Sequence, residues 1–346
     1  MGQAGYMVEG CMRVARLHAA GDIRLADEPV PTAGPGMSLV RITSVGICGS
    51  DLHWWTDSGI GDSQLIAPLV LGHENAGVIV AGPGSGERVA IDPAIPCGGC
   101  RQCREGNRNL CPMVQFAGHG SLDGGMRDFV AWPRALLHRL PDGLTECDGA
   151  MLEPLGVAAH AVDLGHLRLG GSAAVVGCGP IGLLVTQLLR SACAAAVIAF
   201  DPLPHRRQAA ASFGADLTAD PATAANLDEL TSGGADVAFE LAGTNQAVQL
   251  AMAATRPGGR VVLAGIPSSD QTTFQASLAR RKGLTIAMVR RMNDAYPRAI
   301  RLAESGTVHL APLVTHRFPL DAASDAMQKA ACRDGLKVVV EPGRQR

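Results

Sequence analysis

Short runs of alternating polarity, broken by glycine and proline, occupy the first part of the chain, up to about residue 140. Such alternation predicts strands with one buried face and turns between them. The one helical turn expected in this part is a short one over 48–55. The pattern therefore predicts an irregular, mostly β domain, with strands over 14–18, 23–25, 38–43, 76–80, 87–91, 126–131 and 136–140.

The pattern changes near residue 158, where apolar strand-like runs begin to alternate with helical periods. This alternation predicts a parallel sheet with helices on both faces. A first helix is expected over 146–155, and the closing run 337–340 is expected to return as a strand to the first domain. The remaining expected elements are strands over 173–176, 197–200, 237–241, 261–264 and 285–288 and helices over 183–192, 247–254 and 296–305.

The length of 346 residues predicts two domains, because a single hydrophobic core stops growing at about 250–300 residues. We expect a first domain over 1–157 and 297–346 and a second domain over 158–296. A net charge of −2 and a hydrophobic fraction of 47% are typical of a soluble globular protein and give no basic surplus for nucleic acid. No apolar run is long enough to cross a membrane.

The ten cysteines are more consistent with metal binding than with disulfides. The first ten residues lack a basic head followed by an apolar run, so we expect no signal peptide and a reducing cytoplasm. Cys97, Cys100, Cys103 and Cys111 have the spacing of a closed four-thiolate zinc site, which leaves no position for substrate. The lobe over 93–112 is therefore predicted to hold a structural zinc.

A second group of potential ligands begins at Cys48 and ends at Glu74. A catalytic zinc needs three ligands drawn from Cys, His and carboxylate, and Cys48, His73 and Glu74 provide such a set. Ser50 and His53 remain available to move protons. The alternative is an ordinary buried cysteine and a structurally hydrogen-bonded histidine.

Glu153 is an acidic residue in the otherwise apolar run 151–156. Burial of an unpaired carboxylate is costly, so we expect this side chain to lie near the metal. The alternative is a local role as a helix cap or ion pair.

The segment after the predicted strand 173–176 contains a glycine-rich turn followed by a helix. Strand, turn, helix, strand and acidic residue occur in the order of a dinucleotide-binding fingerprint. Asp201 can accept hydrogen bonds from ribose hydroxyls and would repel a 2′-phosphate, which favours NAD over NADP. Arg206 and Arg207 could instead help to bind a phosphate. The residues of the turn are Gly177, Gly179, Pro180, Ile181 and Gly182.

Taken together, these motifs resemble the zinc-dependent medium-chain dehydrogenases over nearly the whole chain, and most closely their polyol branch, typified by sorbitol dehydrogenase. The resemblance implies an α/β protein with a GroES-like, mostly β catalytic domain and a Rossmann cofactor domain with a doubly wound parallel sheet. It also implies zinc, with two ions per subunit, NAD as cofactor, and assembly as a homodimer or homotetramer.

The resemblance further implies roles for individual residues. Those matching Cys48 and His73 bind the catalytic zinc, and the one matching Glu74 is a ligand or a close neighbour. The polyol branch has a glutamate at the position of Glu153, where the alcohol branch has a cysteine. Residues matching Ser50 and His53 form the proton relay, and those matching Trp54 and Arg291 face the substrate.

The expected activity is the reversible, NAD-dependent oxidation of a secondary alcohol to a ketone, with a polyol or sugar alcohol as substrate. Trp54-Trp55 replaces the tyrosine or phenylalanine that polyol members often carry, so a bulky cyclic or aromatic alcohol is the alternative substrate. An alternative of another class is a catalytically silent NAD-binding protein that keeps zinc for structure.

Overall fold

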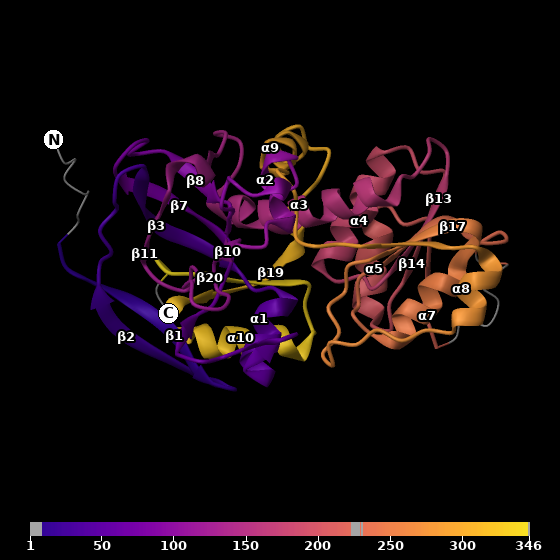
Figure 1. The fold of residues 1–346 in the computed structure, drawn as a ribbon, viewed down its shortest axis with the longest axis horizontal. Helices are drawn as coiled ribbons and strands as arrows, with labels where there is room; N and C mark the ends of the chain where they lie inside the picture. Colours follow the sequence, from indigo (N-terminus) through magenta and orange to yellow (C-terminus); the bar gives the residue numbers. More distant parts are fainter. Residues whose placement is uncertain (1–8, 223–228, 230, 345–346) are drawn as a thin grey trace. The chain divides into compact units, whose positions relative to one another are not determined.

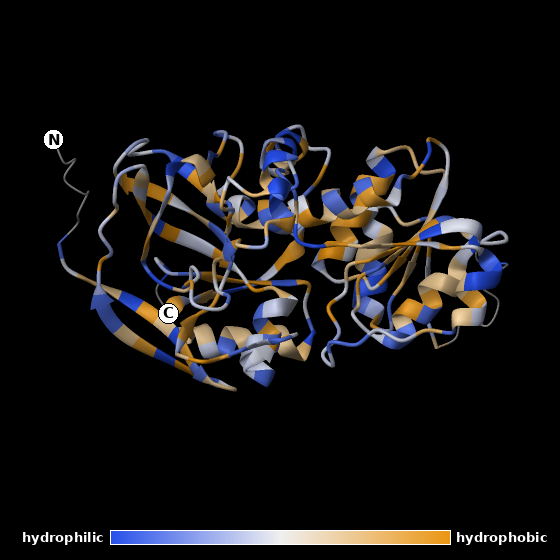
Figure 2. Cartoon of the chain, viewed as in Figure 1, coloured by the Kyte–Doolittle hydropathy of each residue, from blue (hydrophilic) through white to orange (hydrophobic). Residues whose placement is uncertain are grey.

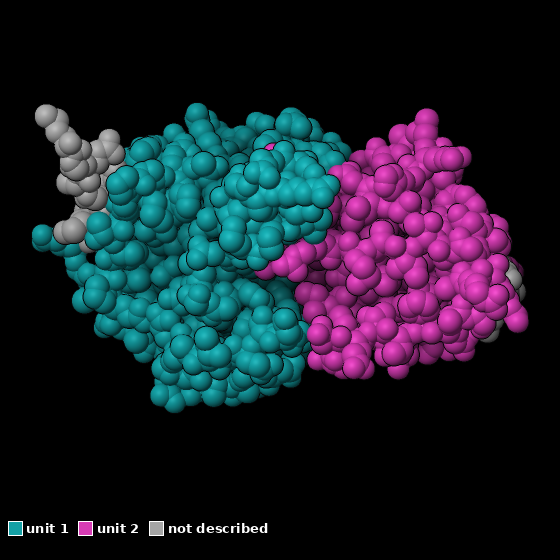
Figure 3. Space-filling model, viewed as in Figure 1, with its two compact units in different colours: residues 1–153, 296–346 teal, residues 154–295 magenta. Residues whose placement is uncertain are grey.

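The computed structural model describes residues 9–222, 229 and 231–344 (Figure 1). The chain divides into unit 1, residues 1–153 and 296–346, and unit 2, residues 154–295 (Figure 3). The sequence placed these boundaries at 157/158 and 296/297. Both divisions return the C-terminal segment to the N-terminal unit.

Unit 1 is built around a seven-stranded sheet in which β3 (Met37–Gly46) is central. Strand β3 pairs antiparallel with β7 (Glu74–Ala81), β11 (Phe129–Pro133) and β20 (Lys337–Glu341). The expected return of the closing strand is thereby confirmed. The sheet is completed by β8 (Arg88–Ile91), β12 (Leu137–Arg139) and β19 (Val314–Pro319).

A second, three-stranded sheet of unit 1 consists of β2, β1 and β6. The core contains apolar residues of both sheets together with side chains of helices α1 and α10, among them Trp54 and Met327. The smaller elements are β1 (Cys11–Ala19), β2 (Asp22–Pro29), β4 (Gly59–Ile60), β5 (Ser63–Gln64), β6 (Leu69–Val70), β9 (Ala94–Ile95), β10 (Gln115–Phe116), α1 (Gly49–Asp57), α2 (Arg101–Arg104), α9 (Tyr296–Glu304), α10 (Ala323–Cys332), η1 (Arg108–Leu110), η2 (Arg134–Leu136), η3 (Ala311–Leu313) and η4 (Leu320–Ala322).

Unit 2 contains a six-stranded, all-parallel sheet in the order β15-β14-β13-β16-β17-β18. This is the order of a doubly wound dinucleotide-binding fold, as the alternating pattern predicted. The strands are mostly orange in Figure 2, because a parallel sheet is buried on both faces. They are β13 (Ser172–Val176), β14 (Ala196–Phe200), β15 (Leu217–Ala219), β16 (Ala235–Glu240), β17 (Thr255–Leu263) and β18 (Thr285–Met288).

The helices of unit 2 follow from right-handed crossovers between parallel strands. Moving outward from β13, α4 (Pro180–Ser191) and α5 (Pro204–Ser212) connect strands in one direction. Beyond β16, α7 (Asn245–Ala254) and α8 (Ala276–Lys282) connect strands in the opposite direction, so the two pairs cover opposite faces. The long helix α3 (Glu146–Gly165) contains the division between the units.

The predicted strands and helices are confirmed, with three kinds of difference. Helix α3 continues ten residues beyond the predicted end at 155, past Pro154. Helix α8 was not predicted because none of its residues is buried, so it has no apolar period to detect. The remaining α-helices and strands that were not predicted are helices α2, α5 and α10 and strands β4, β5, β6, β9, β10, β15 and β19.

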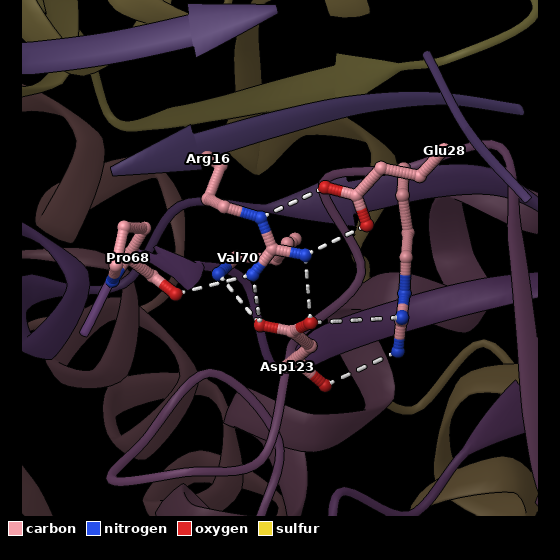
Figure 4. Close-up of polar contacts among 6 residues, drawn as sticks. Arg16, Glu28, Pro68, Val70 and Asp123 are labelled. Atoms are coloured by element: carbon pink, nitrogen blue, oxygen red, sulfur yellow. Dashed lines mark hydrogen bonds and ion pairs between the residues drawn. The ribbon is translucent and has the colours of Figure 1, made fainter. Parts of the chain in front are cut away.

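A network of charged side chains connects the three-stranded sheet of unit 1 to the loop that contains Asp123 (Figure 4). Arg16 donates to Glu28 at 2.9 Å and 2.8 Å and to Asp123 at 2.9 Å and 3.0 Å, and also bonds the Pro68 carbonyl at 3.1 Å. Asp123 accepts a further hydrogen bond from the Val70 amide at 3.0 Å. The guanidinium therefore holds the loop against β1, β2 and β6.

The same loop continues along the segment that precedes His73. The amides of Gly124, Gly125 and Met126 donate to the carbonyls of Val70, Gly72 and Leu71 at 2.7–3.0 Å. A side chain on Gly124 would collide with this backbone, so glycine is needed there. The ion network thus fixes the approach of the chain to the candidate metal site.

We expect Asp123→Asn to lower the stability of the protein by about 1–2 kcal/mol, because Arg16 loses one of its two carboxylate partners and the Val70 amide loses a charged acceptor. The melting temperature should fall by about 1–3 °C for a chain of 346 residues. Differential scanning calorimetry measures this. Asp22→Asn is the matched control, because Asp22 pairs with Arg24 on the surface and its loss should not shift the melting temperature. Equal shifts in the two variants would contradict a special role of Asp123.

Candidate metal centres and cofactor site

Cys48, His73 and Glu74 meet inside unit 1, each with a ligand atom within 4.8 Å of the others. Cys48 caps the amino end of α1, and His73 and Glu74 lie at the start of β7. Because β7 pairs with the end of β3, residue 74 lies opposite residue 46, just before Cys48. Strand pairing therefore brings together ligands that are 25 residues apart in the sequence.

Asp51 orients two of these ligands. Its carboxylate accepts from the Cys48 amide at 2.9 Å and the Gly72 amide at 3.2 Å, and it lies 3.4 Å from His73 Nδ1. Burial alone would raise the pKa of Asp51, but His73 and the amides outweigh it and lower the pKa. A carboxylate on Nδ1 leaves the other ring nitrogen to face a metal, the arrangement that ligating histidines adopt. No motif in the sequence points to Asp51.

Glu74 also forms an ion pair with Lys337 of β20. The Nζ atom of Lys337 donates to Oε1 of Glu74 at 2.6 Å, and both residues are almost fully buried, at 2% and 1% exposure. A side chain at Gly46 would collide with both, so only glycine fits there. The signal that the sequence analysis missed was a single lysine at the head of the apolar run 337–340.

Glu153 lies in α3, outside the trio of ligand atoms. Burial raises the pKa of Glu153 to about 7; the cations of His73 and Lys337 oppose this rise, and the charge of Glu74 adds to it. The carboxyl is 4% exposed and has no hydrogen-bond partner among the described residues. A buried carboxyl without a protein partner, electrostatically coupled to the trio, fits a metal nearby.

The relay candidates Ser50 and His53 lie on α1, three positions apart, so they share one face of the helix. Both are partly exposed, and His53 Nδ1 lies 3.4 Å from the exposed carboxylate of Asp57. Trp54 is 1% exposed and packs edge-on against His119 at 5.3 Å between ring centroids. Its predicted contact with substrate stays a prediction, as does that of Arg291, which belongs to unit 2.

The four remaining cysteines of the motifs converge around α2. Cys97, Cys100, Cys103 and Cys111 have sulfur atoms within 4.8 Å of one another. Three backbone amides point at these sulfurs, each at 3.4 Å: Cys97 to Cys111, Cys100 to Cys97 and Cys103 to Cys100. Amides aimed at sulfur stabilise thiolates, the form that binds metal.

The acidities of these thiols show why a cation fits among them. Amides of Gly99 and Cys100 lower the pKa of Cys97 to about 6, whereas burial and the neighbouring thiols raise the pKa of Cys103 to about 12. Four thiolates this close repel one another, so all four can ionise together only around a positive ion. The donor set and spacing are those of a closed zinc site.

The glycine turn of unit 2 lies between β13 and α4. Gly177 has φ +99° and approaches the backbone of Leu241 and Ala242 too closely for a side chain. Pro180 begins α4, whose amino end carries unpaired amides that can bind a phosphate. Ile181 and Gly182 follow in its first turn, and a side chain on Gly182 would collide with the Gly177 carbonyl.

Asp201 directly follows the next strand, β14, beside this turn. It is 4% exposed and accepts from the amides of Cys178 at 2.8 Å and Leu203 at 2.9 Å. The two nearby arginines make different contacts. Arg207 donates to the Asp201 carbonyl at 2.7 Å and forms an ion pair with Asp220. Nη1 of Arg206 lies 3.8 Å from the position that a Cβ on Gly179 would occupy. Arg206 therefore lies at the turn and Arg207 is held away from it.

Known protein families match both parts of the chain, the one that contains the candidate metal ligands and the one that contains the glycine turn. A family model described as alcohol dehydrogenase GroES-like domain matches residues 34–142, and one described as zinc-binding dehydrogenase matches residues 180–305. Sorbitol dehydrogenase of Bacillus subtilis is 34% identical over 345 residues, which cover 96% of this chain and 98% of that protein. This chain belongs to the zinc-dependent medium-chain dehydrogenases, in their polyol branch.

Solved structures agree with the fold of this medium-chain dehydrogenase. L-idonate 5-dehydrogenase of Escherichia coli superimposes with a TM-score of 0.91 at 26% identity, covering 98% of this chain and all of that one. A structure from Sinorhizobium meliloti, provisionally described as a zinc-binding dehydrogenase, contains NADP and superimposes with a TM-score of 0.88 at 31% identity, covering 96% of this chain and 100% of that one. The expectations of zinc and a nicotinamide cofactor are thereby confirmed.

The described helices of this dehydrogenase include none with the length and apolar character that a membrane crossing requires.

We expect Cys103→Ser to remove one zinc ion and lower the thermal stability, because a closed thiolate site contributes folding energy. Turnover per folded molecule should stay unchanged. Metal analysis, calorimetry and active-site titration measure the three quantities. Cys193→Ser, an exposed cysteine outside both clusters, is the control and should change none of them. Loss of turnover at unchanged stability would show that the lobe serves catalysis.

We expect Asp201→Asn to reduce discrimination against NADP by about tenfold or more, because the variant keeps the shape of the side chain and removes the repulsive charge. The ratio of kcat/KM for NAD and NADP measures it. Arg206→Gln in the same background should weaken NADP again if Arg206 approaches the 2′-phosphate. A wild type that already prefers NADP would contradict the role given to Asp201.

Proposed function

We propose that this dehydrogenase oxidises a polyol or sugar alcohol to the ketone, reversibly, with NAD as hydride acceptor. The observation that carries the proposal is the trio of half-buried Cys48 and buried His73 and Glu74, which contains one thiol. A site with a single thiolate favours oxygen ligands more than a two-thiolate site does. Vicinal hydroxyls offer such ligands, and the relative from Bacillus subtilis is a sorbitol dehydrogenase.

The residues of the candidate site are suited to different roles in this reaction. Zinc held by Cys48, His73 and a carboxylate would bind a substrate hydroxyl and lower its pKa. Asp51 keeps His73 in position, and Lys337 neutralises Glu74. The hydroxyl of Ser50 would accept the substrate proton as it gives up its own, and His53, which is partly exposed on the same helix, would return a proton to solvent. Arg291 is proposed to orient the distal hydroxyls of the substrate.

The test is NADH formation with a panel of sugar alcohols, vicinal diols, simple secondary alcohols and bulky cyclic alcohols. The proposal expects the highest kcat/KM with a polyol that presents adjacent hydroxyls. Preference for a cyclic or aromatic alcohol would support the alternative suggested by Trp54 and Trp55. NAD binding without turnover on any member of the panel would support the silent protein.

We also propose two zinc ions per subunit, a cytoplasmic location and a homodimeric or homotetrameric assembly. Strand β18 lies at the edge of the sheet of unit 2 and leaves Ile286 and Met288 exposed, at 37% and 67%. An edge strand with apolar side chains is a template for pairing with a second copy. We therefore place the primary subunit contact on β18.

Met288→Lys should shift the protein toward smaller species, because it places a charge on the proposed subunit contact. Multi-angle light scattering after size-exclusion chromatography measures the mass. Ile66→Lys is the control, since Ile66 is a highly exposed apolar residue of unit 1. An unchanged mass in the Met288 variant, or an equal loss in the control, would exclude β18 as the contact.

The two carboxylates of the catalytic centre are distinguished by matched glutamine variants. If Glu74 is the direct ligand, Glu74→Gln should lose the catalytic zinc and, because Lys337 is left buried and unpaired, about 3–5 kcal/mol of stability. Glu153→Gln should then keep the metal while turnover falls about tenfold or more. Zinc content, melting temperature and kcat measure the outcome.

The Glu74→Gln/Lys337→Met double variant is the control that separates the two effects. It should recover stability, because no charge stays unpaired, without recovering zinc. Loss of zinc from the Glu153 variant alone would instead make Glu153 the ligand, as the resemblance to the polyol branch allows.

A further inference from the structure

Unit 2 contains a cavity of about 340 Å³ at the amino ends of its strands. It is formed between the loop after α3 and the starts of β16, β17 and β18. The glycine turn that serves the cofactor follows the carboxyl end of β13. All strands of the sheet run in the same direction, so the cavity lies at their amino ends and the cofactor turn at their carboxyl ends. The cavity is therefore not part of the cofactor site.

A bulge in the sheet shapes this cavity. Ala235 pairs with Thr255 and Val237 pairs with Arg260, so one residue of β16 faces the four residues 256–259 of β17. The extra residues loop outward and contain Gly258, which has φ +73°. The loop carries Arg256 to the rim, while Arg260 begins the regular part of the strand.

Three arginines line the cavity, Arg168, Arg256 and Arg260, against one carboxylate, Asp236. Each oxygen of that carboxylate already accepts a hydrogen bond, one from the Ser172 amide at 2.8 Å and one from Arg256 Nε at 2.7 Å. The side chains of Arg168 and Arg260 have no hydrogen-bond or ion-pair partner among the described residues. Two guanidinium groups thus share a concave surface without a counter-ion.

We propose that this cavity binds a small molecule that carries a phosphate group. Arg168 and Arg260 contact the phosphate oxygens, and Arg256, held by Asp236, adds to the positive field. Guanidinium groups suit phosphate because they present several donors in one plane. The volume is at the lower end of that of small-molecule sites, so it has room for a phosphate with a short carbon skeleton.

The ligand differs from the pyrophosphate of the cofactor in how it is held. The glycine turn binds its phosphates with backbone amides at a helix terminus, whereas the cavity offers side-chain cations on strand ends and a loop. Occupation of the cavity therefore does not require NAD to leave.

Titration calorimetry of the intact enzyme, saturated with NAD, tests the proposal with inorganic phosphate, pyrophosphate and ribose 5-phosphate. Chloride at matched ionic strength is the reference for non-specific screening. We expect saturable binding of at least one phosphate compound. Arg168→Ala and Arg260→Gln should each weaken it about tenfold. Tighter binding of ribose 5-phosphate than of phosphate would show that the rest of the cavity is used.

Arg281→Ala is the matched control, an exposed arginine of the same unit on α8 that does not line the cavity. It should leave binding unchanged, and all three variants should keep the KM for NAD and the melting temperature of the wild type. The proposal is overturned if no phosphate compound binds, if binding follows ionic strength alone, or if the Arg281 variant loses as much affinity as the other two. Competition with NAD that Arg168→Ala and Arg260→Gln leave intact would assign the binding to the cofactor turn and overturn it too.

Discussion

Glu74 and Lys337 lie 263 positions apart in the sequence and form an ion pair in the interior of unit 1. Burial of a single charge costs several kcal/mol of stability unless an opposite charge lies beside it. Glu74 and Lys337 can meet only when β7 and β20 both pair with β3 in the observed register. That register also brings Glu74 beside Cys48 and places the C-terminal strand in the N-terminal unit. Gly46 lies on β3 between them, where any side chain would separate the ions. One electrostatic requirement thus connects the topology of the sheet with the geometry of the metal centre.

The two candidate zinc centres differ in how the fold prepares them. The four-cysteine lobe is local: its ligands lie within 15 residues, and backbone amides aim at the sulfurs with little help from a core. The trio that we propose as the catalytic site is assembled by long-range strand pairing, and Asp51 and Lys337, which are not themselves ligands in our proposal, contact His73 and Glu74. The lobe can therefore contribute stability without chemistry, whereas the trio depends on the packing of the whole unit.

In unit 2, different charged and polar groups lie at the carboxyl ends and at the amino ends of the strands. At the carboxyl ends, a helix terminus and the carboxylate of Asp201 surround the glycine turn, and they favour an NAD ribose beside a pyrophosphate. At the amino ends, Arg168 and Arg260 line a cavity beside a bulge in β17, and neither side chain has an ion-pair partner among the described residues. In our proposal the sheet binds two ligands that carry phosphate. Backbone amides hold one at the carboxyl ends of the strands, and arginine side chains hold the other at the amino ends.

The sequence by itself determined the features that depend on local order. The spacing of four cysteines, the glycine turn with Asp201 after its second strand, and the alternation of strands and helices each reflect neighbours in the chain, and the structure contains all three. Glu74 and Glu153 were already candidates from the sequence, but only the tertiary structure brings Asp51 to His73 and Lys337 to Glu74. These contacts depend on the pairing of β3 with β7 and β20, and no pattern within one segment encodes a partner 263 residues away. The burial of Trp54 and the cavity behind the β17 bulge likewise arise from packing and strand register, which the periodicity of a single strand does not specify.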